Sequence, residues 1–135
     1  MKIFFRNNYP WILWGLFILV LVCLPGDKIP KVPKLIDLFE PDKLVHLVMF
    51  ALLTWWMIVG LRKQFGLMIS QTDLVFYILL AVTLYGGGTE LIQYYWIPGR
   101  ICSLPDFIAN EIGCFAGFFV HHRFRRFSWQ AWQAR

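Results

Sequence analysis

The sequence predicts an all-α fold: a multi-pass membrane protein whose four transmembrane helices form a bundle. Of the 135 residues, 59% are hydrophobic and only 16% are charged, whereas roughly a quarter of the residues of a soluble domain are charged. Four apolar stretches approach the length of about twenty residues that a spanning helix needs. They do not alternate as barrel strands do, so each is expected to be a helix. The spans are expected at about residues 9–25, 44–61, 74–96 and 104–121 of a single domain that covers residues 1–135.

The first two stretches are bounded by charges and turn residues. The first follows Arg6 and ends at Pro25-Gly26. No small-x-small site follows it, so we do not expect a cleaved signal peptide. The second is preceded by Asp42-Lys43 and followed by Arg62-Lys63. Between the two stretches, a short interfacial helix over Val32 to Phe39 is expected to cover the polar residues described below.

The last two stretches contain small residues that predict close helix packing. The third includes the triplet Gly86 to Gly88, and because glycine weakens a helix, the triplet indicates close helix contact or local bending. The fourth has small residues four positions apart, which lets a neighbouring helix approach closely. These residues are Ala109, Gly113 and Gly117.

The distribution of basic residues predicts the orientation of the chain. With four spans, eight Lys and Arg residues share the side of the two termini and five share the other side. The positive-inside rule therefore places both termini in the cytoplasm. The eight residues are Lys2, Arg6, Arg62, Lys63, Arg123, Arg125, Arg126 and Arg135, and the five are Lys28, Lys31, Lys34, Lys43 and Arg100.

Several classes of function are not supported by the sequence. The net charge of +5 does not indicate a nucleic-acid partner, because the basic residues cluster at the ends of apolar runs and no nucleic-acid motif accompanies them. Cys23, Cys102 and Cys114 lack CxxC spacing, so neither a disulfide framework nor a zinc site is predicted. No motif activates Cys102 or Ser103 as a nucleophile. The sequence predicts no cofactor and leaves the oligomeric state open.

Four alternating spans bring polar residues from three places to the outward side of the bundle. In each place two polar residues are three or four positions apart, so both members of the pair share one helix face. The pairs are Asp42 and His46, Glu90 and Gln93, and Asp106 and Asn110. Ionisable groups within spans usually face the bundle interior or a wet cavity, so we expect a common polar pocket. Its predicted binding residues are Asp42, Lys43, His46, Glu90, Gln93, Arg100, Asp106 and Asn110.

These residues form motifs that resemble the VanZ-like family. The motifs are Asp42-Lys43-x-x-His46-x-x-x-Phe50, Glu90-x-x-Gln93, Pro98-Gly99-Arg100 and Asp106-x-x-Ala109-Asn110-x-x-Gly113. The resemblance implies a small multi-pass membrane protein of the cell envelope. The founding member is associated with low-level resistance to teicoplanin, and the family has no established biochemical activity. Glu111 departs from the family pattern, which has an uncharged residue at that position.

We expect the pocket to bind the headgroup of an envelope lipid or a lipid-linked cell-wall precursor. Arg100 suits such a ligand because a guanidinium forms two parallel hydrogen bonds with a carboxylate or phosphate; the alternative is an ion pair with Asp106 or Glu90. His46 either forms a hydrogen bond to Asp42 or Glu90, or acts with Glu90 as acid and base in an enzyme that modifies the lipid. In a third interpretation the cluster only joins helices. Without HExxH or a comparable motif, no metal site is predicted.

Overall fold

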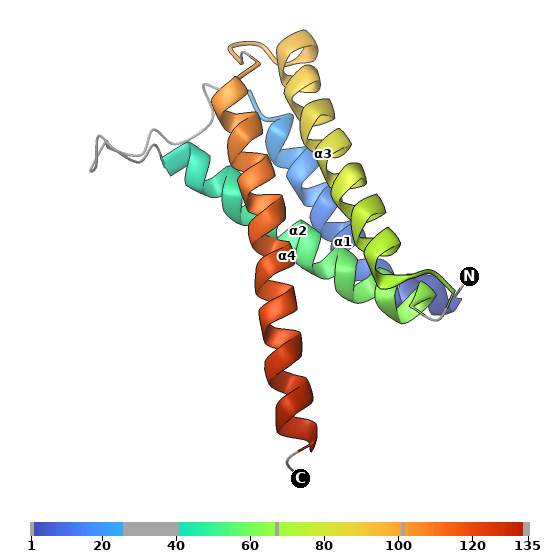
Figure 1. Cartoon of the computed structure of the whole chain (residues 1–135). Helices are drawn as coiled ribbons and strands as arrows, with labels where there is room; N and C mark the ends of the chain where they lie inside the picture. The colour runs from blue at the N-terminus through green and yellow to red at the C-terminus, as the bar shows by residue number, and fades with distance from the viewer. Residues whose placement is uncertain (1, 26–40, 67, 101, 134–135) are drawn as a thin grey trace.

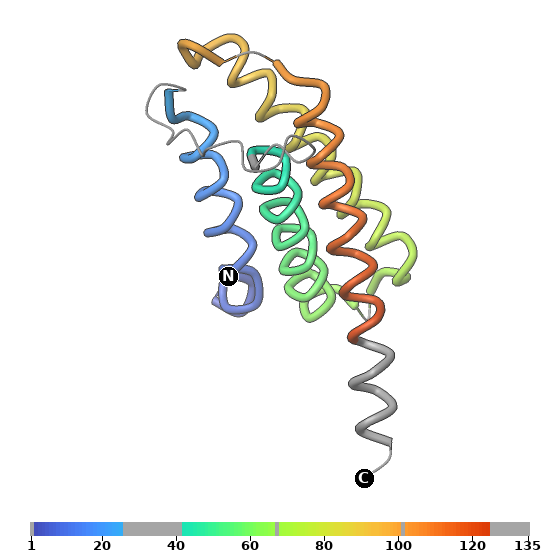
Figure 2. Tube along the Cα trace, turned by 90° about the vertical axis from the view of Figure 1, so that its left-hand side faces the viewer, coloured from blue at the N-terminus to red at the C-terminus, as the bar shows by residue number. Residues whose placement is uncertain are grey.

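The computed structural model is an all-helical bundle that describes residues 2–25, 41–66, 68–100 and 102–133, and no strand occurs among them. The predicted interfacial helix over Val32 to Phe39 lies outside these residues. Successive helices run in opposite directions, so α2 begins, α3 ends and α4 begins at one end of the bundle (Figure 1 and Figure 2). The helices are α1 (Lys2–Val22), α2 (Pro41–Phe65), α3 (Gln71–Trp96) and α4 (Leu104–Gln133).

Three of these helices, α1, α2 and α3, are long and apolar enough to cross a membrane. Large apolar side chains on the outside of the helices, such as Leu13 and Leu84, are more than half exposed. Soluble proteins rarely expose many such side chains together, whereas lipid-facing helices do. α4 is longer still, at 30 residues, but Asp106, Asn110 and Glu111 make its first half more polar. The four-span bundle therefore stays a prediction, while the four helices and three candidate spans are observed.

Two helices extend well beyond their predicted spans. α1 already begins at Lys2, and α4 continues to Gln133. In the added turns of α1, the buried Asn8 donates a hydrogen bond to the Phe4 carbonyl oxygen at 2.9 Å and accepts one from Trp11 at 2.7 Å. Hydropathy indicates where a helix meets lipid, whereas hydrogen bonding decides where it ends. Spans assigned from apolar stretches therefore do not include the polar turns at the helix ends.

The backbones of α2 and α4 approach each other closely along the predicted stripe of small residues. A Cβ atom on Gly113 would overlap the carbonyl oxygen of Leu47, and one on Gly117 would overlap that of Ala51. Ala109, one turn before Gly113, is buried as well. The stripe therefore allows direct backbone contact, as small residues do between membrane helices.

The glycine triplet makes one close contact and does not interrupt α3. A Cβ atom on Gly86 would lie 3.1 Å from the ring of Phe50 and 3.6 Å from the side chain of Asn110. A Cβ atom on Gly88, by contrast, would meet nothing within 4 Å. Close helix contact is thus confirmed at the first glycine, which lets the Asn110 side chain of α4 lie between α2 and α3.

Polar groups on aromatic rings attach α1 to its neighbours. The Trp14 indole N–H donates to the Met49 carbonyl oxygen at 2.9 Å, and the Tyr85 hydroxyl donates to the Gly15 carbonyl oxygen at 2.6 Å. Each ring thus buries its apolar body while its polar atom finds a partner. The most deeply buried apolar side chains are Ile18, Phe50, Ile58, Ile78, Val82 and Cys114.

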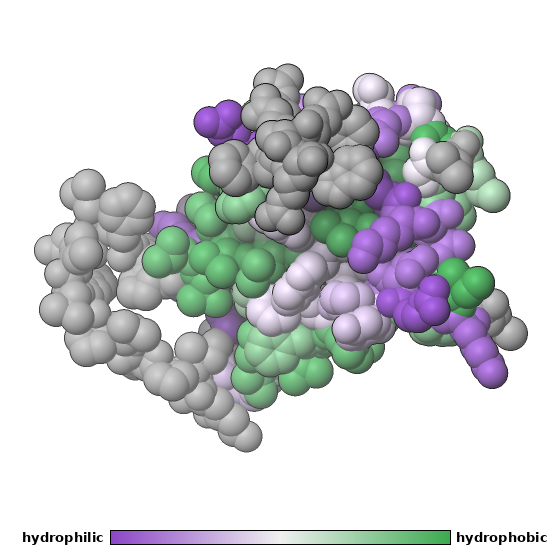
Figure 3. Space-filling view, turned by 90° about the horizontal axis from the view of Figure 1, so that it is seen from below, coloured by the Kyte–Doolittle hydropathy of each residue, from purple (hydrophilic) through white to green (hydrophobic). Residues whose placement is uncertain are grey.

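Hydrophilic side chains gather at the end of the bundle where α1 begins and α2 is followed by α3. Figure 3, which views this end, shows them beside apolar flanks. Arg62 and Lys63 lie in the last turn of α2, where positive charge interacts favourably with the helix dipole. Ser70 caps α3 by accepting from the backbone N–H of Asp73 at 3.1 Å. The residues of the predicted pocket lie at the opposite end.

Candidate functional site

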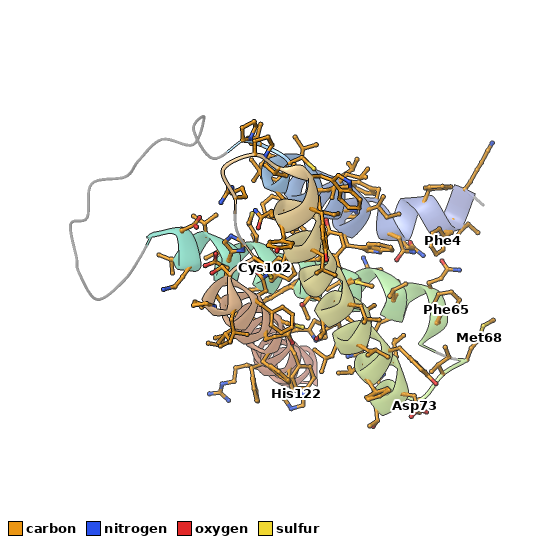
Figure 4. All side chains as sticks on the ribbon, turned by 90° about the horizontal axis from the view of Figure 1, so that it is seen from above. Phe4, Phe65, Met68, Asp73, Cys102 and His122 are labelled. Atoms are coloured by element: carbon orange, nitrogen blue, oxygen red, sulfur yellow. The ribbon has the colours of Figure 1, made fainter. Side chains whose placement is uncertain are left out.

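Polar residues of α2, α3 and α4 meet at the end of the bundle where α3 is followed by α4. Figure 4 looks down on this end and labels Cys102 in the connection between the two helices. His46, Glu90, Gln93 and Asn110 have exposed fractions of 5% or less. Burying such groups costs free energy unless each one finds a partner. Their hydrogen bonds therefore indicate which atoms remain available to a ligand.

His46 of α2 is hydrogen-bonded to Asn110 of α4, whereas the sequence indicated Asp42 or Glu90 as its partner. The Nδ1 atom of His46 lies 3.0 Å from the Oδ1 atom of Asn110. Because an amide oxygen only accepts, Nδ1 is the donor of this hydrogen bond, and Nε2 is not engaged by Asn110. The Nδ2 atom of Asn110 is buried and has no hydrogen-bond partner among the described residues. The pair joins two helices and still leaves a ring nitrogen able to bind a cation or a proton.

Glu90 connects α3 to the start of α4 through only one of its carboxylate oxygens. Oε2 accepts a hydrogen bond from the backbone N–H of Ser103 at 3.1 Å. Oε1 is buried and has no hydrogen-bond partner in the described part of the chain. The carboxylate lies within electrostatic reach of His46, Asp106 and Arg100. One oxygen of Glu90 thus fixes the loop, and the other is available to the pocket.

A tight turn positions Arg100. The Arg100 backbone N–H donates to the Ile97 carbonyl oxygen at 3.2 Å, and Gly99 has a φ of 76°. Proline followed by a residue with positive φ is the signature of a type II turn, which favours glycine at that position. The Pro98-Gly99 pair therefore sets the direction of the chain at Arg100. The guanidinium Nε is buried without a hydrogen-bond partner among residues that the structure describes.

Ser103 contributes to the site in a way that the sequence analysis missed. Its Oγ atom accepts a hydrogen bond from the backbone N–H of Asp106 at 3.3 Å, as the N-cap residue of α4 does. Its own N–H is the group that donates to Glu90. Side-chain chemistry indicates Ser103 only as a possible nucleophile, whereas Ser-x-x-Asp before an apolar run resembles a capping box. That spacing is the signal that could have identified it.

Two carboxylates approach His46 from different helices. One oxygen each of Asp42 and Asp106 and one ring nitrogen of His46 lie within 4.8 Å of one another. Asp42 is exposed, and Asp106 is partly buried. Lys43 follows Asp42 in the sequence and is half-buried, but it is not one of these three residues. Gln93 is buried near the end of α3. Such a set of atoms can hold a proton or a cation, while the guanidinium nearby can hold an anion.

Glu111, the departure from the family pattern, lies outside this site. The hydroxyl of Thr83 on α3 donates a hydrogen bond to its Oε2 atom at 2.7 Å. A threonine on the neighbouring helix thus supplies a partner for a carboxylate in the middle of the bundle. The Oε1 atom of Glu111 is buried without a hydrogen-bond partner among the described residues, so Thr83 satisfies only one oxygen of this carboxylate.

Comparison with models of protein families, with curated proteins and with solved structures finds no match to this chain. The VanZ-like resemblance therefore rests on the motif residues and stays a prediction. Function has to be inferred from the geometry of the polar site.

Proposed function

We propose that this chain is a VanZ-like, four-span protein of the bacterial inner membrane. In this proposal its outward pocket binds the headgroup of an envelope lipid or of a lipid-linked cell-wall precursor. The apolar helices and the gathering of buried polar residues at one end of the bundle support it. Both termini would face the cytoplasm, because the side that they share has more Lys and Arg residues.

The observation that carries this proposal is the buried Nε atom of Arg100, which lacks a hydrogen-bond partner among the described residues. Leaving a buried donor unpaired costs about 1–3 kcal/mol. A ligand that accepts this hydrogen bond recovers that free energy. Envelope lipids and peptidoglycan precursors present phosphate and carboxylate groups near the membrane surface, and a guanidinium binds both with paired hydrogen bonds.

Seven of the eight predicted site residues, all except Asp42, have a role in this proposal. Basic side chains attract the anionic group, two polar residues orient Arg100 and its loop, and the remaining residues complete the hydrogen bonding. The attracting residues are Lys43 and Arg100, the orienting residues are Asp106 and Asn110, and the others are His46, Glu90 and Gln93.

Arg100→Ala is expected to lower the amount of co-purified anionic lipid about tenfold, because a hydrogen bond to a charged group contributes about 1.5–3 kcal/mol. The measurement is quantitative mass spectrometry of lipids extracted from the chain after purification in a mild detergent. Arg123→Ala removes an exposed arginine farther along α4 and serves as the matched control. Equal lipid retention by the two variants would contradict the proposed role of Arg100.

An enzyme that acts on the same lipid is the second candidate. His46 and Glu90 lie within electrostatic reach of each other, and Glu90 keeps one oxygen without a partner in the described region. Together they have the composition of a general acid and base. Incubating the purified chain with envelope lipids distinguishes the candidates. A binding protein leaves the lipids unchanged, whereas an enzyme forms a product that the Glu90→Gln variant does not form.

The four-span topology predicts that Cys102 faces the outside of the cell. Cys102 is exposed and Cys114 is buried, so the chain contains its own topology probe. A membrane-impermeant maleimide applied to intact spheroplasts is expected to label a chain whose only cysteine is Cys102, made by Cys23→Ser and Cys114→Ser. A chain with Cys114 alone should remain unlabelled. Labelling of Cys102 only after permeabilisation would reverse the proposed orientation.

A further inference from the structure

We infer that Asp42, His46 and Asp106 form a binding site for one divalent transition-metal cation of the Zn²⁺ or Mn²⁺ type. One potential ligand atom from each residue lies within 4.8 Å of the other two. Atoms that bind the same metal at about 2.0–2.2 Å lie at most about 4.4 Å apart. Asp42 is exposed in the first turn of α2, so its side chain can rotate toward the other two ligand atoms.

The hydrogen bond between His46 and Asn110 prepares the imidazole for a metal. Histidines that bind metals nearly always donate the N–H of the other ring nitrogen to an oxygen of the protein, which fixes the tautomer and the ring orientation. His46 Nδ1 lies 3.0 Å from Asn110 Oδ1, and Asn110 is fully buried. With Nδ1 facing Asn110, Nε2 is the ring nitrogen that this proposal assigns to the metal.

Glu90 is an independent indication of a bound cation. The residue is 2% exposed, and its Oε1 atom has no hydrogen-bond partner within the described ranges. Its carboxylate lies within electrostatic reach of His46 and Asp106. A buried carboxylate oxygen without a partner is costly. Glu90 is not one of the three potential ligands, so in this proposal a water molecule bound to the metal supplies the missing interaction.

The balance of charge at this end of the bundle also favours a cation. Among the predicted site residues that the structure describes, three carboxylates, those of Asp42, Glu90 and Asp106, accompany two basic side chains, those of Lys43 and Arg100. Excess negative charge at membrane depth is costly. One divalent cation makes the sum positive. Because three protein ligands leave a coordination position open, a phosphate or carboxylate oxygen could bind there.

The ligand set selects the kind of metal. An imidazole with two carboxylates suits Zn²⁺ and Mn²⁺. Ca²⁺ and Mg²⁺ prefer sites made of oxygen atoms alone. We therefore expect millimolar Mg²⁺ or Ca²⁺ to compete poorly with micromolar Zn²⁺.

Metal binding is tested on the full chain without a histidine tag, reconstituted with ZnCl₂ or MnCl₂ after treatment with a chelator. Desalting and plasma mass spectrometry are expected to find one metal ion per wild-type chain. Asp42→Asn and Asp106→Asn keep the side-chain size, and each should weaken binding about tenfold or more. Asp73→Asn and His122→Gln change an exposed carboxylate and an exposed histidine outside the cluster, and should bind as wild type does.

Two results would overturn the metal site: a wild-type chain that retains neither metal, or aspartate variants that retain as much as the wild type. Asp42 is exposed, so loss of metal in Asp42→Asn with unchanged thermal unfolding excludes misfolding as the cause. Metal binding by these residues does not require Arg100 or a lipid. An Arg100→Ala chain that loses lipid but retains Zn²⁺ therefore separates the two proposals.

Discussion

Gly113→Val is expected to prevent accumulation of the folded chain in the membrane. Any Cβ atom at this position would overlap the carbonyl oxygen of Leu47. The overlapping atom belongs to the α2 backbone, so no side-chain rotation relieves it, and α2 and α4 must separate. Overpacking a well-packed interior usually costs about 1–3 kcal/mol, and we expect at least the upper value where two helix backbones touch. The measurement is the yield of monodisperse protein and its thermal unfolding in detergent.

Gly88→Ala is the matched control, because a Cβ atom there would meet nothing within 4 Å. Alanine favours a helix over glycine by about 1 kcal/mol, so this variant should be as stable as the wild type or slightly more stable. Gly113→Ala should already reduce stability, since even a methyl group causes the overlap. If Gly113→Ala and Gly88→Ala unfold at the same temperature, the direct contact between α2 and α4 is wrong.

Most of the fold could be predicted because apolar length and the spacing of small residues report directly on lipid and on helix contact. The stripe that ends at Gly117 indicated the close approach of α4 to another helix, but a pattern on one helix does not identify its partner as α2. The extra turns of α1 escaped prediction because they depend on local hydrogen bonds such as that from Asn8 to Phe4. Hydropathy does not establish α4 as a membrane span, because Asp106 and Asn110 interrupt its apolar run.

The candidate site was less predictable than the fold, because its contacts join residues far apart in the chain. Alternating spans predicted which end of the bundle the polar residues share. They could not predict that His46 would contact Asn110, 64 positions away, since helix rotation decides that pairing. The possible metal ligands come from α2 and α4, so no compact sequence motif indicates them. The role of Ser103 depends on a backbone N–H, which side-chain chemistry does not reveal.

Asn110→Leu is expected to destabilise the chain by about 1–3 kcal/mol, because it leaves the Nδ1 donor of His46 buried without an acceptor. His46→Leu should have a similar cost, because it removes the partner of Asn110 Oδ1. The double variant removes both polar groups, and replacing both partners of a buried hydrogen bond by apolar groups is close to neutral. It should therefore recover most of the lost stability. Unfolding in detergent of the wild type, the single variants and the double variant gives the coupling energy between the two residues.

The size of that coupling and the retention of Zn²⁺ together separate a structural from a functional role of the pair. Single variants that each lose about 1 kcal/mol and a double variant that loses nothing give a coupling of about 2 kcal/mol. That coupling is larger than the average of about 0.6 kcal/mol and the maximum of about 1.7 kcal/mol for hydrogen bonds between membrane helices. If the double variant is stable but no longer binds Zn²⁺, the helices do not need the polar pair, since leucine joins them equally well. His46 and Asn110 are then required for binding the metal. A double variant that still binds Zn²⁺ contradicts the metal site. A double variant as unstable as the less stable of the two single variants means that side-chain shape, and not the hydrogen bond, holds α2 and α4 together at this position.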